Sequence, residues 1–388
     1  MTDSIFGSMT VYVKALLLHY TGIIYCKKRK KMKKINQSNF TLGVIKGYKI
    51  TFLVKIFATI ITIVAFAISC AMPRLPEKPT GEYFWPPPPN TPRIKWLTQW
   101  SNQFDFKKPN LLLTQLMGPE KIWMLIRPNG VVADSAGNVY VADSELGVIF
   151  VFDQEKQALR LMGKGTFGTP IGLAIDNKRG ILFVSDSKLD KVFGLNKDNG
   201  MVILSLGMPN EYKNPSGLAY DEERERLYVS DTKNHMVRVF DKNGKQLFTI
   251  GKKGEGDGEF NMPSYLAVDR NGRLYVVDSF NFRVQIFDTD GKFLNKFGKV
   301  GDASGQFARP FGIGVDSEGH IYVVDSAFNN FQIFNEDGKL LLGVGQVGKN
   351  PGEFYLPTGM YIDKQDRIYI SDTFNYKVQV FQYLKEKK

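Results

Sequence analysis

Short apolar runs of four to six residues alternate with polar turn residues from about residue 127 to the end of the chain. The runs are rich in Val, Ile, Phe and Tyr, which favour strands. Turn pairs such as Asn243-Gly244 and Asp290-Gly291 separate them, and these pairs favour tight hairpins because Gly accepts a positive φ. No part of this region shows a sustained helical period. The pattern therefore predicts an all-β structure of short strands.

The same pattern recurs six times. The first unit contains residues 127–134, 138–143 and 148–153, and each later unit repeats this order. One aspartate after the second apolar run marks each unit, at intervals of 43, 45, 47, 47 and 47 residues: Asp143, Asp186, Asp231, Asp278, Asp325 and Asp372. Four short strands per unit are best accommodated by the radial repetition of small four-stranded antiparallel sheets.

The repeated sequence resembles the NHL family. The pattern that the units share is Pro-x-Gly, an apolar-Asp turn, Tyr-Val-x-Asp-Ser/Thr and an apolar strand that ends in Phe-Asp, and the resemblance covers about residues 127–384. It implies a six-bladed β-propeller. The Gly-rich linkers 251–263, 298–310 and 345–357 also follow the family. We expect Phe260, Phe307 and Phe354 in these linkers to pack between blades.

The sixth unit ends after its third strand, at Phe381-Gln382-Tyr383-Leu384. A ring that lacks one strand has an unpaired edge. The apolar segment 93–100, which contains Ile94, Trp96, Leu97 and Trp100, precedes the first unit. We predict that it supplies the outer strand of the last blade and closes the ring. The marker aspartates are predicted to be structural, each accepting hydrogen bonds from the turn that follows it.

The chain before the repeats divides into a targeting segment, 1–70, and a Pro-rich linker, 71–92, leaving the propeller at 93–388. A basic stretch precedes the apolar run 56–68, and the small residues before Cys70 follow it. This order indicates a secretory signal, and Cys70 after small residues resembles a bacterial lipobox. The resemblance implies lipidation of Cys70 at the cell envelope, with the outer membrane preferred because Ala71 follows. An uncleaved signal anchor is the alternative, and the opening at Met32 suits the true translation start.

The linker contains Trp85-Pro86-Pro87-Pro88-Pro89 near its end, and such a run favours an extended polyproline II spacer.

The net charge of the chain is distributed unevenly between the targeting segment and the propeller. Of the formal charge of +12, residues 1–70 contribute eleven Lys or Arg against Asp3 alone, whereas residues 93–388 hold 38 basic and 36 acidic residues. A nucleic-acid-binding protein would carry its excess of positive charge on the folded domain, so a nucleic-acid partner is not expected.

The repeats contain few residues suited to catalysis. Both cysteines precede residue 93, and His235 and His320 are the only histidines of the repeats. They fall after a second strand and after a first turn, at opposite ends of their blades, so no three-histidine zinc site is expected. The first strands are apolar, and no Ser-His-Asp set is available. We expect no metal and no cofactor, and the alternative function is a propeller hydrolase or lyase with an unrecognised metal site.

These observations favour a non-catalytic, lipid-anchored, extracytoplasmic propeller that acts as a monomeric scaffold for an envelope protein, peptide or glycan. The expected binding face carries the loops between blades and the loops after the second strands, where exposed aromatic residues would form an interaction patch. Its candidate residues are Arg127, Ser216, His235, Tyr265, Phe280, Phe282, Arg309, Phe311, Phe328, Thr358, Phe374 and Tyr376.

Overall fold

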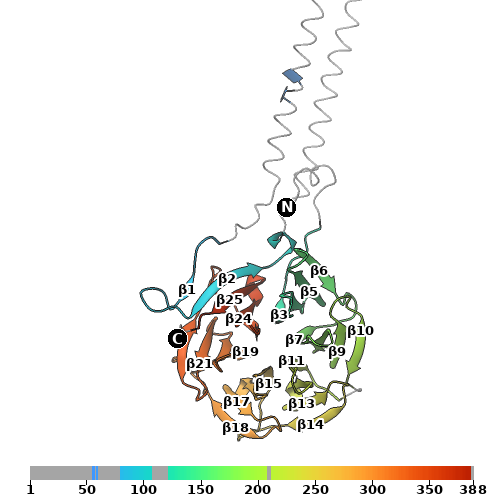
Figure 1. Cartoon of the computed structure of the whole chain (residues 1–388), viewed down its shortest axis with the longest axis vertical. Coiled ribbons are helices and arrows are strands. Elements are labelled where there is room, and N and C mark those ends of the chain that lie inside the picture. Colours follow the sequence, from blue (N-terminus) through green and yellow to red (C-terminus); the bar gives the residue numbers. More distant parts are fainter. Residues whose placement is uncertain (1–54, 57, 60–78, 107–120, 208–210, 386–388) are drawn as a thin grey trace, which may run out of the picture. The chain divides into compact units, whose positions relative to one another are not determined.

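The computed structural model describes residues 55–56, 58–59, 79–106, 121–207 and 211–385 (Figure 1). The chain divides into two compact units, Met1–Glu77 and Lys78–Lys388. The described residues of the first unit are helical, and within the described residues no helix has the length and apolar character to cross a membrane. Most of the predicted targeting segment, including Met32 and Cys70, lies outside the described residues.

The second unit consists of six antiparallel sheets arranged around a central axis, which confirms the predicted six-bladed propeller (Figure 1). Within each of the first five blades the chain begins at the axis and moves outwards strand by strand, and the sixth blade does so for its three inner strands. The first, innermost strands are β3 (Pro128–Ala133), β7 (Pro170–Asp176), β11 (Pro215–Asp221), β15 (Pro263–Val268), β19 (Pro310–Val315) and β23 (Pro357–Ile362). The second strands are β4 (Val139–Asp143), β8 (Ile181–Asp186), β12 (Arg226–Asp231), β16 (Leu274–Asp278), β20 (Ile321–Asp325) and β24 (Arg367–Asp372).

The third strands are still mostly buried, and exposure to solvent increases at the outer strands. The third strands are β5 (Val148–Asp153), β9 (Lys191–Asn196), β13 (Met236–Asp241), β17 (Arg283–Phe287), β21 (Asn330–Phe334) and β25 (Lys377–Tyr383). The outer strands of the first five blades are β6 (Ala158–Met162), β10 (Val202–Leu206), β14 (Gln246–Ile250), β18 (Phe293–Phe297) and β22 (Leu340–Val344). Short 3-10 helices follow three of the second strands: η2 (Thr232–Asn234), η3 (Ser279–Asn281) and η4 (Thr373–Asn375).

The sixth blade is completed by a strand that precedes the first blade in the sequence. β2 (Ile94–Trp100) pairs antiparallel with β25, so that Ile94 faces Tyr383 and Trp100 faces Val378. The predicted closing strand is therefore confirmed. The burial of Ile94 and Trp96 in the core of this blade explains why an isolated apolar segment precedes the repeats. The 3-10 helix η1 (Gln103–Asp105) follows β2.

The end of the predicted linker belongs to this blade and is not a free spacer. β1 (Phe84–Trp85) pairs with β2 and makes the sixth blade five-stranded, where four strands were expected. The Trp85 ring packs edge-on against Phe381, with ring centroids 5.8 Å apart. Burial of a large aromatic ring outweighs the preference of the neighbouring prolines for a solvated extended chain.

Apolar side chains fill the spaces between neighbouring blades. The second strands β4, β16 and β20 are buried at every position, because both faces of a middle strand contact other blades, whereas the outer strands β14 and β18 expose most of their residues. Phe260, Phe307 and Phe354 are fully buried between blades, as predicted. Full burial of such a side chain contributes roughly 1.5–3 kcal/mol.

Glycine sets the close approach of the first strands at the axis. Five of these strands have Gly at their third position, and a Cβ there would collide with the backbone of the next blade's first strand; for Gly217 the colliding atom is the Ser264 carbonyl oxygen. The fourth blade has Tyr265 at this position instead. Tyr265 is therefore the one large side chain at a position that glycine occupies in the other five first strands.

Candidate functional site

The marker aspartates connect each blade to the loop that leads into it. Asp143 accepts a hydrogen bond from the Leu146 N–H in the following turn at 3.0 Å and from the Ile126 N–H before the first strand at 2.6 Å. The other five accept the equivalent N–H of the preceding loop. Burial raises the pKa of Asp372 to about 6, although the Tyr355 N–H favours the carboxylate. The predicted structural role is confirmed.

In the last four blades the residue after the marker aspartate joins neighbouring blades, whereas Ser144 and Ser187 bond to the loop that leads into their own blade. The Thr232 and Thr373 hydroxyls donate to the carbonyl of the first proline of the next blade, Pro263 and Pro128, each at 2.8 Å. Ser279 and Ser326 make the equivalent bonds to Pro310 and Pro357. The Ser or Thr after the marker aspartate therefore contributes to ring assembly in these four blades.

The two histidines of the repeats lie at opposite ends of their blades, as predicted, and each has a structural partner. His235 accepts a hydrogen bond from the Met262 N–H at 3.1 Å, and the ring of His320 shares one with the Asp316 carboxylate at 2.8 Å. Within the described residues no group of three or more His, Cys, Asp or Glu side chains is placed to hold a metal ion.

The loop face, formed by the loops between blades and the loops after the second strands, exposes several of the predicted binding residues. Phe280 is 62% exposed, and Phe374 and Tyr376 are 40% and 45% exposed. Arg309 is also exposed and lies over the half-buried Phe311 ring at 5.2 Å. Arg127 is exposed as well, 3.6 Å from Glu145.

The other candidates are less accessible. Ser216 is buried and its hydroxyl bonds to the Thr232 hydroxyl and the Ser264 carbonyl, so it joins blades. The hydroxyl of the half-buried Thr358 contacts Thr373 at 2.8 Å. His235, Phe282 and Phe328 are half-buried.

Three further apolar side chains on the loops between blades are exposed: Val300, Val347 and Tyr355. The sequence did not predict them, because loop residues outside the motif carry no repeat signal.

A cavity of about 580 Å³ occupies the axis towards the opposite end of the ring, where the turns between first and second strands lie. All six first strands contribute to its apolar walls, among them Leu173, Leu218, Leu266, Ile313 and Met360. The sequence predicts that these strands are apolar but predicts no binding site among them. An apolar residue that faces a cavity has the same sequence pattern as one that packs against a neighbour, so the sequence contained no signal for this site.

Three tyrosines are among the residues that line the cavity: Tyr220, Tyr265 and Tyr361. Tyr220 receives a hydrogen bond from Arg179 at 3.3 Å. The Tyr265 hydroxyl is buried and has no hydrogen-bond partner among the described residues. Burial raises the pKa of Tyr265, so the hydroxyl keeps its proton at neutral pH and can donate it.

Charged side chains surround the cavity mouth. Glu222 of the third blade lies 2.7 Å from Lys364 of the sixth and accepts a 2.8 Å hydrogen bond from the Asn177 side chain of the second. Arg270 of the fourth blade donates to the Lys364 carbonyl at 3.3 Å. Desolvation favours protonation of Glu222, but the hydrogen bonds from Lys364 and Asn177 outweigh it and lower the pKa of this carboxyl group.

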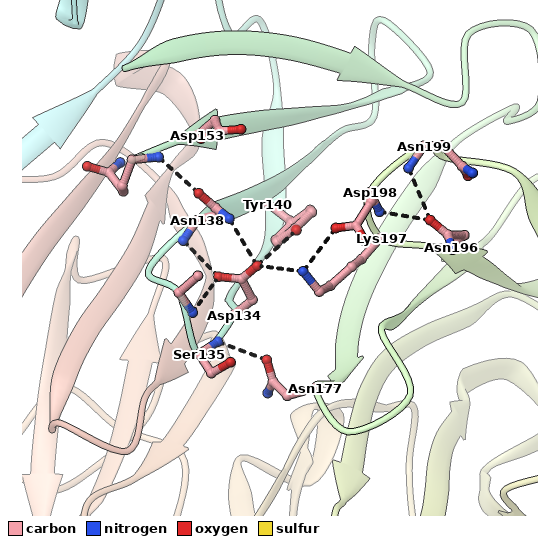
Figure 2. Close-up of polar contacts among 12 residues, drawn as sticks. Asp134, Ser135, Asn138, Tyr140, Asp153, Asn177, Asn196, Lys197, Asp198 and Asn199 are labelled. Atoms are coloured by element: carbon pink, nitrogen blue, oxygen red, sulfur yellow. Dashed lines mark hydrogen bonds and ion pairs between the residues drawn. The ribbon is translucent and has the colours of Figure 1, made fainter. Parts of the chain in front are cut away.

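The first turns are held in place by polar contacts between blades. Figure 2 shows Lys197 of the second blade reaching Asp134 of the first, with Nζ 3.2 Å from Oδ2. Asp134 also accepts a hydrogen bond from the Tyr140 hydroxyl, and Asn177 accepts the Ser135 N–H at 2.8 Å. The Asn177 side chain therefore bonds to the first blade through Ser135 and to Glu222 of the third blade at the cavity mouth.

A family model described as a 6-bladed beta-propeller (DUF5128) matches residues 210–279, 268–331 and 315–388. No curated protein matches the sequence. The propeller implied by the resemblance to NHL repeats is thus supported independently, whereas membership of the NHL family itself stays a prediction.

Several solved structures share the fold. A protein of unknown function from Bacteroides thetaiotaomicron is 19% identical, with a TM-score of 0.56 over 66% of this chain and 70% of its own. An auxiliary nutrient binding protein from the same organism is 13% identical, with a TM-score of 0.54 over 67% and 70%. A streptogramin B lyase is 12% identical, with a TM-score of 0.53 over 74% and 99%. Enzymes and binding proteins both occur among them, so the fold alone does not decide between catalysis and binding.

Proposed function

We propose that this protein is a non-catalytic, lipid-anchored, extracytoplasmic propeller that binds an envelope protein or peptide on its loop face. The proposal of an anchor rests on the signal-like apolar run and on Cys70. The proposal of binding rests on the exposed apolar side chains of the loop face.

One observation carries the binding role. Phe280, Phe374 and Tyr376 of the loop face are exposed, together with Val300 and Val347, which are each 64% exposed. Exposed apolar side chains that gather on one face of a protein mark an interaction site, whereas singly scattered ones do not. Aromatic residues that a partner can cover contribute disproportionately to the affinity of protein interfaces. The aliphatic residues among them favour a protein or peptide over a glycan, which is the second ligand class.

A non-catalytic role is favoured by how the polar groups are used. The described Ser, Thr and His side chains of the repeated motif bond within or between blades, and the mouth aspartates pair with basic neighbours. The alternative, a hydrolase or lyase with a metal site, would be supported by a stoichiometric ion in the purified full-length protein. Elemental analysis by mass spectrometry measures this directly.

The binding role is tested by crosslinking in intact cell envelopes. We expect the triple variant Phe280→Ala, Phe374→Ala and Tyr376→Ala to lose the crosslinked partner that the wild type retains. Leu294→Ala with Leu341→Ala is the matched control, because these side chains are 50% and 49% exposed on outer strands of the fourth and fifth blades. Loss of the partner in the control alone, or its retention in the triple variant, would refute the loop face as the binding surface.

A further inference from the structure

The axial cavity is a second candidate site, on the end of the propeller away from the loop face. Its volume of about 580 Å³ lies within the range of sites that enclose small molecules. Ala267, Val268, Val315 and Ile362 line it and are only half-buried in the folded ring. The walls therefore suit a compact apolar body of small-molecule size.

Tyr265 gives the apolar chamber one specific polar feature. It occupies the position at which the other five blades have glycine, and its side chain is only 7% exposed. Its ring packs 6.3 Å from that of Phe311, which fixes its orientation, and its hydroxyl has no partner within the described part of the chain. A buried donor without a partner is unfavourable, and a ligand with an acceptor atom would relieve that cost.

Carboxylates outnumber cations among the residues that line the cavity, and one cation at its mouth, Arg270, has no carboxylate partner among the described residues. Each first turn has an aspartate that is paired with a basic side chain: Asp134 with Lys197, Asp176 with Arg179, Asp221 with Arg224, Asp269 with Arg273, Asp316 with His320 and Asp363 with Arg367. Glu223 likewise pairs with Lys178, and Glu222 with Lys364. Arg270 bonds only to the Lys364 carbonyl and has no carboxylate partner among the described residues.

From these observations we propose that the cavity binds a small amphipathic carboxylate. The apolar body of the ligand contacts the chamber walls, an acceptor atom along it receives the Tyr265 hydrogen bond, and the carboxylate pairs with Arg270 at the mouth. The ligand carboxylate also displaces Glu222 from Lys364. Glu222 is therefore an internal competitor that occupies the second cation until a ligand arrives.

Binding is measured by calorimetry on the full-length chain in lipid nanodiscs, with empty nanodiscs as the blank and 4-phenylbutyrate as the probe. We expect one probe per propeller. Arg270→Met and Lys364→Met should each weaken binding by about tenfold through loss of a charge pair, and Tyr265→Phe by about fivefold through loss of one hydrogen bond. Tyr265→Phe keeps the shape of the ring, so it tests the hydroxyl without disturbing the fold.

Glu222→Gln gives the sharpest test, because removing a competitor should tighten binding by severalfold, whereas a merely structural role would weaken it. The neutral analogue 4-phenylbutanol should bind much more weakly than the carboxylate. The loop-face variant Phe280→Ala should leave probe affinity unchanged, which separates this site from the proposed partner surface. Equal affinity for the alcohol, weaker binding to Glu222→Gln, or no effect of Arg270→Met would overturn the proposal.

Discussion

The ammonium nitrogen of Lys364 lies 2.7 Å from Oε2 of Glu222, although the two residues belong to blades on opposite sides of the ring. Only long side chains can span the axis in this way, and they do so where the apolar walls of the cavity end. The pair thus crosses the mouth of the cavity.

This ion pair is expected to contribute little to stability. The Lys364 side chain is 71% exposed, and exposed pairs contribute roughly 0–1 kcal/mol. Lys364→Met should therefore change the free energy of unfolding by less than about 1 kcal/mol, as measured by chemical denaturation. A larger loss would show that the pair holds the ring together.

The closing strand should be a major source of stability. Trp96 is 7% exposed and packs in the core of the sixth blade, whereas its neighbour Leu97 is 40% exposed. We expect Trp96→Ala to lower the free energy of unfolding by about 3–5 kcal/mol and Leu97→Ala by less than about 1 kcal/mol. Deletion of residues 93–105 should lower the melting temperature more than either. An unchanged melting curve for the deletion would disprove the closure.

The axial glycines should resist even the smallest side chain. A Cβ at Gly217 would meet backbone atoms of the fourth blade, while a Cβ at Gly343 on outer strand β22 would meet nothing within 4 Å. Gly217→Ala should cost about 1–3 kcal/mol or more from overpacking, and Gly343→Ala should be neutral or stabilise by up to about 1 kcal/mol. Equal effects in denaturation experiments would contradict the close packing at the axis.

Stability should depend on pH through His320. Its hydrogen bond with the Asp316 carboxylate raises the pKa of His320, with burial opposing. A histidine whose folded pKa exceeds its unfolded value of about 6.5 stabilises the fold fully below that pH, and the contribution disappears as pH rises through the folded pKa. The melting temperatures of wild type and His320→Gln should therefore differ most below pH 6.5 and converge above the folded pKa. A constant difference would exclude this linkage.

Lipidation is tested by metabolic labelling with an alkyne fatty acid. The wild type should incorporate the label and fractionate with membranes, while Cys70→Ser should lose the label. Cys26→Ser is the matched control, since it removes the other cysteine of the chain. Label that persists in Cys70→Ser would place the modification elsewhere, and its absence from the wild type would favour an uncleaved anchor.

The sequence predicts much of the fold because the repeat records it six times. The phenylalanine plugs and the marker aspartates recur at fixed positions, and a missing fourth strand in the last unit points to residues 93–100. Features that occur once are harder to predict. Phe84 and Trp85 form a strand within a proline-rich segment whose composition favours an open spacer.

The candidate sites were predicted unevenly. Phe280 and Phe374 lie exposed on the loop face as expected, because their positions follow directly from the repeat. Tyr265 was expected on that face but lines the axial cavity, since a residue's place along a first strand does not reveal how wide the axis is. The bond between Glu222 and Lys364 joins residues 142 positions apart and has no local signal.

The pairing of β2 with β25 also bears on when folding can finish. Because Ile94 pairs with Tyr383, β2 has no partner strand in a nascent chain until β25 has been synthesised. The earlier blades can form one after another, but the pairing of β2 with β25 that closes the ring forms last. For the exported protein that we propose, this delay would keep the ring open until residues near Tyr383 are available to pair with β2.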